Sequence, residues 1–541
     1  MSFAANFTSA ALETFLVHDS ANAGLLGLVL TRVIVCLLFV LVFWRTWRFT
    51  VLPFLHPDRP KEFPYWVPFV GHGRAFFLDS NGLLSKARSY LGDTQEPFAL
   101  TAFGMTFYVV TQAKQSAEVY RNTETLSFED FVQGLMRING NDENIIEAVY
   151  SPLPTDKAGF PNPQGESLGV LAQRMHAHQL HPGENLVVLQ KQVQAWIDQH
   201  LSLADLAAFP STVSKGPTSI EVPLYQWCSE AFIQLGQDVY FGDTLTQIDP
   251  ALPAAFLAFD ELIWKMLYQY PSFLSVDMTA PRTQVIASLN KYFRVPQSQR
   301  SGSTAWLINA MEDEMRAIGV EGENLAVVMF HLYLAINTNT RKTTFWVLSY
   351  LIYHPSLLAT YRAETAAAFD SSGALIDPFL IQDPSRCPSV DAIWHETLRM
   401  SGWAASVRLV STDTVIGGKH MRKGNRVMVP HRLLHFDAGV FGEDPHEFRP
   451  ERWMQKKAED GTSSLARSPS WRPFGAGKTM CSGRFLARFS VTTFVATLLR
   501  RFDVQVVGNP PFPKADEGRP VLGTMSVKEG YDFKVMISLR E

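Results

Sequence analysis

A short glycine-rich loop with one cysteine, residues 473–483, constrains this chain more than any other segment. It reads Pro-Phe-Gly-Ala-Gly-Lys-Thr-Met-Cys-Ser-Gly and leads directly into a helical pattern at 484–501. Its glycines allow backbone conformations closed to other residues, and they let the chain approach a flat ligand closely. The first N–H groups and the positive dipole end of the following helix stabilise a thiolate at Cys481. A lone thiolate without a second Cys or His at metal-binding spacing suits an axial haem ligand, and it suits neither a zinc site nor a disulfide.

A second constellation lies upstream of that loop, where Trp-His-Glu-Thr-Leu-Arg occupies 394–399. On a helix Glu396 and Arg399 are three residues apart and lie on one face, close enough to pair. Such a pair alone is usually a solvated surface contact that stabilises little. Between this segment and the loop stands Phe-Arg-Pro-Glu-Arg-Trp at 448–453, which contributes Arg452. Three motifs in this order and spacing argue against a chance match.

Together these motifs resemble those of the cytochrome P450 superfamily. The loop matches the family's haem-binding pattern at Phe474, Gly477, Cys481, Gly483 and Ala487. The resemblance implies a mainly α-helical fold with small β-sheets, in which haem b lies between a long central helix and the cysteine loop. It implies Cys481 as the axial iron ligand, with cofactor contacts from Phe474, Gly475, Gly477 and Gly483. It also implies a structural ionic triad of Glu396, Arg399 and Arg452.

One position of the loop departs from the family pattern. Thr479 stands where the family usually has Arg or His in contact with a haem propionate. The resemblance places another propionate-binding arginine at Arg408, and a guanidinium can bind a carboxylate through two hydrogen bonds. The alternative is a surface arginine on a strand. For the second propionate ligand, Arg174 and His178 are candidates, and the sequence does not select between them.

The distal side of the resemblance rests on Ile-Asn-Thr-Asn-Thr at 336–340. Thr340 keeps the family's hydroxyl, whereas Asn339 replaces its acid, and asparagine cannot shuttle protons as a carboxylate does. We therefore expect Thr340 and Asn339 to be the catalytic pair, with Asn339 orienting rather than donating. This pair before Phe-Trp resembles the branch that includes steroid 7α- and 12α-hydroxylases and prostacyclin synthase. The alternative for Thr340 is a helix hydroxyl bonded to the backbone.

The N-terminal part of the chain carries a membrane signal. Residues 24–44 are predicted to form a transmembrane anchor, because they are apolar and long enough to span a bilayer. One charge, Arg32, costs about 2.5–3.5 kcal/mol there, which the apolar residues offset. Arg45 and Arg48 follow at once, so the positive-inside rule places the catalytic domain in the cytosol. A cleaved signal peptide is the alternative, but a basic first region and a small-residue cleavage site are missing.

The organisation along the chain follows from this anchor. We expect a short luminal N-terminus (1–23), the anchor (24–44), a basic and proline-rich hinge (45–71), and a haem-thiolate domain (72–541). Asn6, in Asn-Phe-Thr, leaves glycosylation open. The domain should carry strands within 98–112 and 408–430, helices within 184–207, 303–353 and 484–501, and loops at 151–167 and 456–472. The predicted location is the endoplasmic reticulum membrane, single-pass.

Composition limits the partners. The net charge of −4 gives no support for a nucleic-acid partner, and four scattered cysteines argue against a disulfide framework. Basic residues beside the cysteine loop, Lys478, Arg484 and Arg488, are expected to steer an acidic electron donor. The family resemblance implies that the segments 128–148, 333–340, 402–407 and 522–526 face the substrate, and their few charges imply a lipophilic one. Named side chains there are Phe128, Phe131, Leu135, Trp403, Ala404 and Met525.

The function implied by the resemblance is that of a membrane-anchored haem-thiolate monooxygenase acting on a sterol, terpenoid or other secondary-metabolite intermediate. No flavin or nicotinamide fingerprint is apparent, so NADPH would act only through a separate protein. The resemblance names NADPH–cytochrome P450 reductase as that partner, with cytochrome b5 as a further candidate. One alternative is a haem-thiolate isomerase or dehydratase that acts on a peroxide without external electrons. Another is a non-catalytic haem- or sterol-binding protein.

Overall fold

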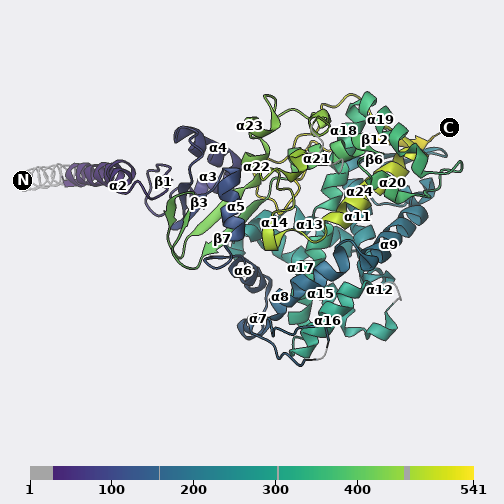
Figure 1. Ribbon diagram of the computed structural model, residues 1–541, viewed down its shortest axis with the longest axis horizontal. Coiled ribbons are helices and arrows are strands. Elements are labelled where there is room, and N and C mark those ends of the chain that lie inside the picture. The colour runs from purple at the N-terminus through teal and green to yellow at the C-terminus, as the bar shows by residue number, and fades with distance from the viewer. Residues whose placement is uncertain (1–28, 158, 301–303, 456–463, 541) are drawn as a thin grey trace, which may run out of the picture.

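The computed structural model describes residues 29–157, 159–300, 304–455 and 464–540. A helical body holds most of the chain, a sheet lies at one side of it, and one helix projects beyond the sheet (Figure 1). The expected mainly α fold with small β-sheets is thereby confirmed.

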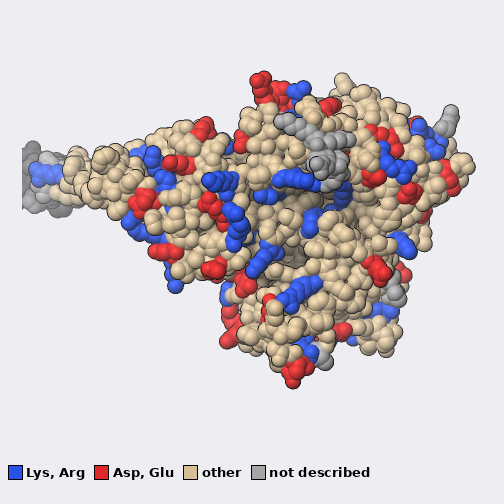
Figure 2. Space-filling view, viewed as in Figure 1, with Lys and Arg blue, Asp and Glu red and all other residues tan. Residues whose placement is uncertain are grey.

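The projecting helix contains the predicted anchor. Residues Val29–Leu55 form one helical segment of 27 residues that is long and apolar enough to cross a membrane. Figure 2 shows this projection almost free of charged side chains, unlike the body, where both signs are interspersed. None of its most apolar window is buried. The predicted luminal segment 1–23, including Asn6, and the start of the anchor at 24–28 lie outside the described residues.

The helix that includes the predicted anchor extends into the predicted hinge. The helix continues past residue 45 through a π-helical turn, η1 (Trp47–Val51), and through α2 (Leu52–Leu55). Pro53 does not end it, because proline in the first turn of a new helical segment needs no N–H donor, and the π turn directly precedes it. The chain leaves the helix at His56. It is then tied back to the helix by an ion pair of 2.8 Å between Arg48 Nε and Glu62 Oε2.

The long central helix is interrupted at the predicted distal pair. The pattern at 303–353 forms α16 (Trp306–Ala317), α17 (Gly322–Asn337) and α18 (Thr340–Tyr353). The break falls on Thr338 and Asn339. Three other helices pack against α18 and bury it: α11 (Leu224–Phe241), α21 (Pro388–Ser401) and α24 (Arg484–Arg501). The main apolar core surrounds these four elements.

The remaining helices surround this core. On the side of the projecting helix lie α3 (Gly73–Leu78), α4 (Ser80–Tyr90), α5 (Ala113–Arg121) and α6 (Glu129–Asn139). Next in the chain are α7 (Glu143–Tyr150), α8 (Leu168–Leu180), α9 (Glu184–His200) and α10 (Leu203–Leu206). Then come α12 (Asp243–Ile248), α13 (Leu252–Asp260), α14 (Ile263–Leu267) and α15 (Val276–Arg294). The last are α19 (Pro355–Thr365), α20 (Pro378–Gln382), α22 (His431–His435) and α23 (Ala438–Phe441).

The larger sheet joins the projecting helix to the body. Its strand order is β1-β2-β3-β10-β7-β4. The strands are β1 (Lys61–Glu62), β2 (Phe98–Ala102), β3 (Met105–Val109), β4 (Leu126–Ser127), β7 (Ala405–Val410) and β10 (Arg426–Pro430). A four-stranded sheet has the order β11-β12-β6-β5, from β5 (Ser214–Lys215), β6 (Ser219–Pro223), β11 (Phe502–Val506) and β12 (Lys534–Leu539). A hairpin pairs β8 (Thr414–Ile416) with β9 (Lys419–Met421). The strands expected within 98–112 and 408–430 are present.

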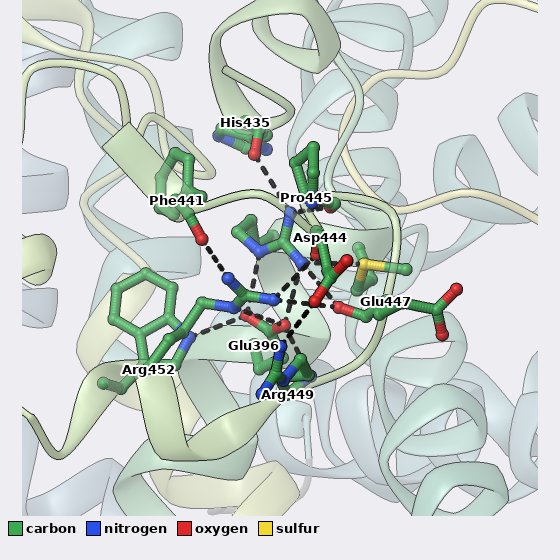
Figure 3. Close-up of polar contacts among 11 residues, drawn as sticks. Glu396, His435, Phe441, Asp444, Pro445, Glu447, Arg449 and Arg452 are labelled. Atoms are coloured by element: carbon green, nitrogen blue, oxygen red, sulfur yellow. Dashed lines mark hydrogen bonds and ion pairs between the residues drawn. The ribbon is translucent and has the colours of Figure 1, made fainter. Parts of the chain in front are cut away.

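The three residues of the predicted triad meet at one carboxylate (Figure 3). Glu396 of α21 is fully buried and accepts two hydrogen bonds of 2.8 Å from the guanidinium of Arg399. Arg452 Nε donates to Glu396 Oε1 at 3.0 Å, and Trp453 Nε1 donates to Oε2 at 2.8 Å. The guanidinium groups also donate to backbone carbonyls between Phe441 and Glu447. The cluster therefore fixes the chain that follows α23 against α21.

Replacing the central carboxylate tests how much this cluster stabilises the fold. Glu396→Gln keeps the shape but leaves two buried guanidinium groups without a counter-charge. We expect a loss of about 3–5 kcal/mol in the free energy of unfolding, measured by denaturant titration of the full-length protein. Glu451→Gln is the matched control, because Glu451 lies on the same segment with an exposed side chain. Equal stability of the two variants would contradict a structural role for the triad.

Candidate active site

A cavity of about 410 Å³ lies between the broken central helix on one side and the cysteine loop with α24 on the other. Residues of α11 and β7 close its edges. Most of the predicted site residues line it: Asn339, Thr340, Arg408, Phe474, Gly475, Cys481 and Gly483. Gly477 does not line it. Its φ of +61° and the Tyr120 carbonyl, 3.0 Å from where a Cβ would lie, explain why a glycine stands there.

The cysteine loop is held by its own backbone. Cys481 N–H donates to the carbonyl of Phe474 at 3.0 Å, and Arg484 Nη1 donates to the carbonyl of Cys481 at 2.7 Å. Cys481 lines the cavity and is exposed to it. Burial raises the pKa of the Cys481 thiol, opposed by the N–H groups of Gly483 and Arg484 and by the Arg484 charge. Coordination to a metal ion would remove this proton outright.

Arg408 is a buried cation beside this loop. Its side chain is 5% exposed, and Nη2 donates at 2.6 Å to the hydroxyl of Thr479, the residue that departs from the family pattern. Nη1 donates to the Val407 carbonyl, and the guanidinium lies 4.6 Å from the ring centre of Phe128. No carboxylate among the described residues pairs with it, and burial lowers its pKa. A buried guanidinium with only neutral partners suits an acidic group entering the cavity, and a surface arginine is excluded.

A second group of polar residues lies next to Arg408 and escapes sequence reasoning. The Tyr120 hydroxyl is 2.7 Å from Ser406 Oγ and 2.9 Å from His431 Nε2. Burial, and then the charges of Arg472 and Arg408, lower the pKa of His431 to about 3, so this ring is neutral. Arg472 Nε is buried without a hydrogen-bond partner. Only Arg472 has a sequence signal, because it directly precedes the loop.

The two candidates for the second propionate ligand are both wrong. Arg174 pairs with Glu166 at 2.5 Å, and His178 bonds Asn185 Nδ2 at 2.9 Å. Neither residue lines the cavity. The residues of α8 that do are His176 and Leu180, because the helical phase turns a different face of α8 inward.

The two residues of the distal pair, Asn339 and Thr340, have different contacts. Asn339 Oδ1 accepts the backbone N–H of Thr524 at 3.0 Å, which holds this amide against the turn at 522–524. The Thr340 hydroxyl lines the cavity and has no hydrogen-bond partner among the described residues. The alternative reading of Thr340, a hydroxyl bonded to the backbone, therefore does not hold. Such a bond is made instead by its neighbour Thr344, whose hydroxyl donates to the carbonyl of Thr340.

A charged cluster supports the break from behind. Thr338 Oγ1 donates at 2.9 Å to Asp260 Oδ1, and the same carboxylate binds Arg341 and, at 2.8 Å, Lys342. All four side chains are buried. Burial alone would raise the pKa of Asp260, but the charges of Lys342 and Arg341 hold it below its ordinary value. No sequence pattern pairs Asp260 with residues so distant in the chain.

The apolar lining is only partly as expected. Phe128, Phe131, Ala404 and Leu522 line the cavity. Leu135, Trp403 and Met525 do not. Trp403 packs against Phe436, and Met525 is fully buried in the core.

Comparison with known proteins decides the family. The profile of the cytochrome P450 family matches residues 229–535, more than half of the chain. The chain belongs to the cytochrome P450 family. It is 25% identical over 480 residues to the cytochrome P450 monooxygenase poxD of Penicillium oxalicum, covering 86% of this chain and 92% of that protein. It is 23% identical over 510 residues to the human 7-alpha-hydroxycholest-4-en-3-one 12-alpha-hydroxylase, covering 89% and 94%.

The fold agrees with this assignment. The crystal structure of the cytochrome P450DA heme domain superposes with a TM-score of 0.64 at 17% identity, covering 89% of this chain and 99% of that one. This cytochrome P450 is therefore an oxidoreductase of the monooxygenase class with haem as its cofactor. The cavity fits that group, because it combines a thiol on one wall with a buried guanidinium that lacks a carboxylate partner.

Removing the guanidinium of Arg408 tests its role toward haem. We expect Arg408→Gln to speed haem loss to excess apomyoglobin by roughly tenfold or more, because a charge-assisted hydrogen bond is worth about 1.5–3 kcal/mol. The matched control is Arg426→Gln on the adjoining strand, whose guanidinium lies outside the cavity lining. Haem loss at the same rate in both variants would rule out a propionate contact by Arg408.

Proposed function

We propose that this cytochrome P450 is a membrane-anchored enzyme that inserts one oxygen atom from O2 into a lipophilic substrate, with electrons from NADPH delivered by a separate reductase. The observation that carries the proposal is the placement of the Cys481 thiol and the unpartnered Thr340 hydroxyl on opposite walls of one cavity. The relatives support the lipophilic class, since their printed names include a sterol-type 12-alpha-hydroxylase and a beta-amyrin 11-oxidase. The apolar helix Val29–Leu55 supports anchoring in the endoplasmic reticulum membrane.

The residues of the cavity would share the work as follows. Cys481 would ligate the haem iron, Phe474, Gly475 and Gly483 would contact the cofactor from the loop, and Arg408 would bind a propionate with Thr479 fixing its guanidinium. Arg472, which precedes the loop and has a buried Nε atom, is the second candidate for a propionate, although it does not line the cavity itself. When bound, the haem supplies the redox chemistry that activates oxygen, and a thiolate ligand favours O–O cleavage.

On the distal side the chain's own groups would handle protons. Thr340 would hold a water or accept a hydrogen bond on the distal side, because its hydroxyl has no partner among the residues that the structure describes. Asn339, fixed by Thr524, would keep the helix break open and orient rather than donate. Phe128, Phe131 and Leu522 would exclude bulk water from the substrate.

The distal hydroxyl gives the decisive test. With the substrate found by metabolite comparison of a deletion strain, Thr340→Ala should lower product formed per NADPH consumed by roughly tenfold or more. Hydrogen peroxide release should rise, while haem content and the thiolate-type carbon monoxide spectrum stay unchanged. Thr344→Ala is the control, because its hydroxyl bonds the backbone within the same helix. Full coupling in Thr340→Ala would show that the hydroxyl is structural. Product formed from a peroxide under argon without reductase would favour the isomerase alternative instead.

The electron donor would dock beside the cysteine loop, where Lys478 is exposed. Arg488 is less suited to this role than expected, because its guanidinium pairs with Asp391 at 2.8 Å. Arg484 donates to the Cys481 carbonyl and stacks on Phe485. Lys478 is thus the one of the three predicted cations whose ammonium group has neither a hydrogen bond nor an ion pair among the described residues.

Charge reversal at Lys478 tests the docking site. Lys478→Glu should slow the first electron transfer from NADPH–cytochrome P450 reductase several-fold at low salt, and the difference should shrink as salt screens the charge. Stopped-flow reduction under carbon monoxide measures this rate. Lys528→Glu, an equal change at an exposed residue outside the loop, is the control. Identical reduction rates for both variants would remove this face as the docking site.

A further inference from the structure

A second cavity, of about 240 Å³, lies where the projecting helix meets the larger sheet. One wall is the end of the helix with Leu52, Pro53 and His56. The opposite wall is formed by strands β1 to β3 and by the segment that joins β9 to β10. We propose that this cavity binds the phosphate of an anionic phospholipid head group. The proposal is independent of the haem site.

The charges of the lining favour an anion. Three arginines, Arg48, Arg59 and Arg422, face one carboxylate, Glu62. Arg48 already neutralises Glu62 through the 2.8 Å ion pair. The guanidinium groups of Arg59 and Arg422 have no carboxylate or carbonyl partner among the described residues, since only their backbone groups form hydrogen bonds. Two free positive charges therefore remain at the mouth of a polar cavity.

Hydroxyl groups in the cavity add donors without acceptors. Tyr108 is 6% exposed, and its oxygen accepts the backbone N–H of Arg422 at 3.3 Å and Asn425 Nδ2 at 3.1 Å. Because both of those bonds point at the oxygen, its own proton is left without an acceptor among the described residues. Thr106 likewise has a hydroxyl in the lining and no partner among them. Phosphate oxygens are acceptors only, so they complement this set.

The histidines and acids near these groups leave no negative charge in the lining that would compete with a phosphate for the two arginines. His56 lines the cavity and His420 closes its rim. His420 faces Asp58 at 3.9 Å, and that carboxylate lies outside the lining. Lys419, the neighbour of His420, is bound to Glu96 at 3.2 Å. Glu62 and Glu96 are therefore each paired with a cation, and the Asp58 carboxylate lies outside the lining.

The place of the cavity selects a lipid as the source of the phosphate. The cavity adjoins the end of a helix that can span a bilayer, and Phe54 beside it is 85% exposed. Trp66 is 57% exposed and stacks with Arg45, whose guanidinium lies 4.0 Å from the ring centre. Aromatic and arginine side chains of this kind gather at the head-group level of a membrane. Basic pockets at the cytosolic surface bind anionic head groups.

Native mass spectrometry of the full-length haem-loaded protein in detergent tests this proposal. We expect phosphatidic acid to bind at a single site in preference to phosphatidylcholine of the same chains. Arg59→Gln with Arg422→Gln should weaken that binding about 30-fold, because about 1 kcal/mol is lost with each direct contact between a guanidinium and the phosphate. Tyr108→Phe, which removes only the buried donor, should weaken it several-fold. Haem content and the carbon monoxide spectrum should not change, so a failure of the proposed function would be seen separately.

The matched control removes two charges from the same face without touching the lining. Lys61→Gln with Lys423→Gln changes exposed residues outside the cavity, and lipid binding should stay within about twofold of wild type because such charges are screened. Equal losses of lipid affinity in both double variants would overturn the site. Unchanged affinity in the arginine double variant, or in Tyr108→Phe, would overturn it as well. Inorganic phosphate bound as tightly as phosphatidic acid would overturn the lipid as its occupant.

Discussion

The carboxylate of Glu396 is the interaction on which the haem-binding half of the fold depends. It accepts hydrogen bonds from Arg399, Arg452, Trp453 and the backbone of Arg449. Both of its oxygens therefore have hydrogen-bond partners, although the side chain is fully buried. A buried charge is tolerated only when its partners are complete. Because the partners come from α21 and from the chain after α23, the ion cluster holds these two segments, which are distant in the sequence, against each other.

One histidine, His435, connects this ion cluster to the cysteine loop. Arg399 donates to the carbonyl of His435 at 3.1 Å, and His435 Nε2 accepts the backbone N–H of Arg472 at 3.0 Å. Burial, together with the charges nearby, lowers the pKa of His435 well below its ordinary value, which keeps this nitrogen an acceptor. A histidine with a lowered folded pKa stabilises the fold above the unfolded pKa and loses that contribution as pH falls below it. The position of the residue before Pro473 therefore depends on the triad.

Local motifs were predictable from the sequence, whereas contacts between distant segments were not. The glycine-rich loop, the Glu-x-x-Arg helix and the Asn-Thr pair each lie within a few residues, and the loop and the pair line one cavity. Arg408 also lies in the cavity, yet its partner Thr479 stood out in the sequence only as a departure from the family pattern and not as a hydrogen-bond acceptor. Arg174 and His178 do not line the cavity, because the helical phase of α8 turns a different face of that helix inward. Sequence patterns alone do not fix that phase.

Buried charges show the same limit most clearly. Arg341 and Lys342 follow Thr340, and side chains of these types are mostly exposed in proteins, but these two are 0% and 2% exposed. What makes this tolerable is Asp260, on a helix that precedes them by many residues. Its carboxylate also takes the Thr338 hydroxyl, so one acid satisfies the cations and the polar group at the helix break. The break is thus stabilised on the side away from the cavity by the ion pairs of Asp260, and on the cavity side by the hydrogen bond between Asn339 and Thr524. This leaves Thr340 as the group at the break whose hydroxyl is free to face the cavity.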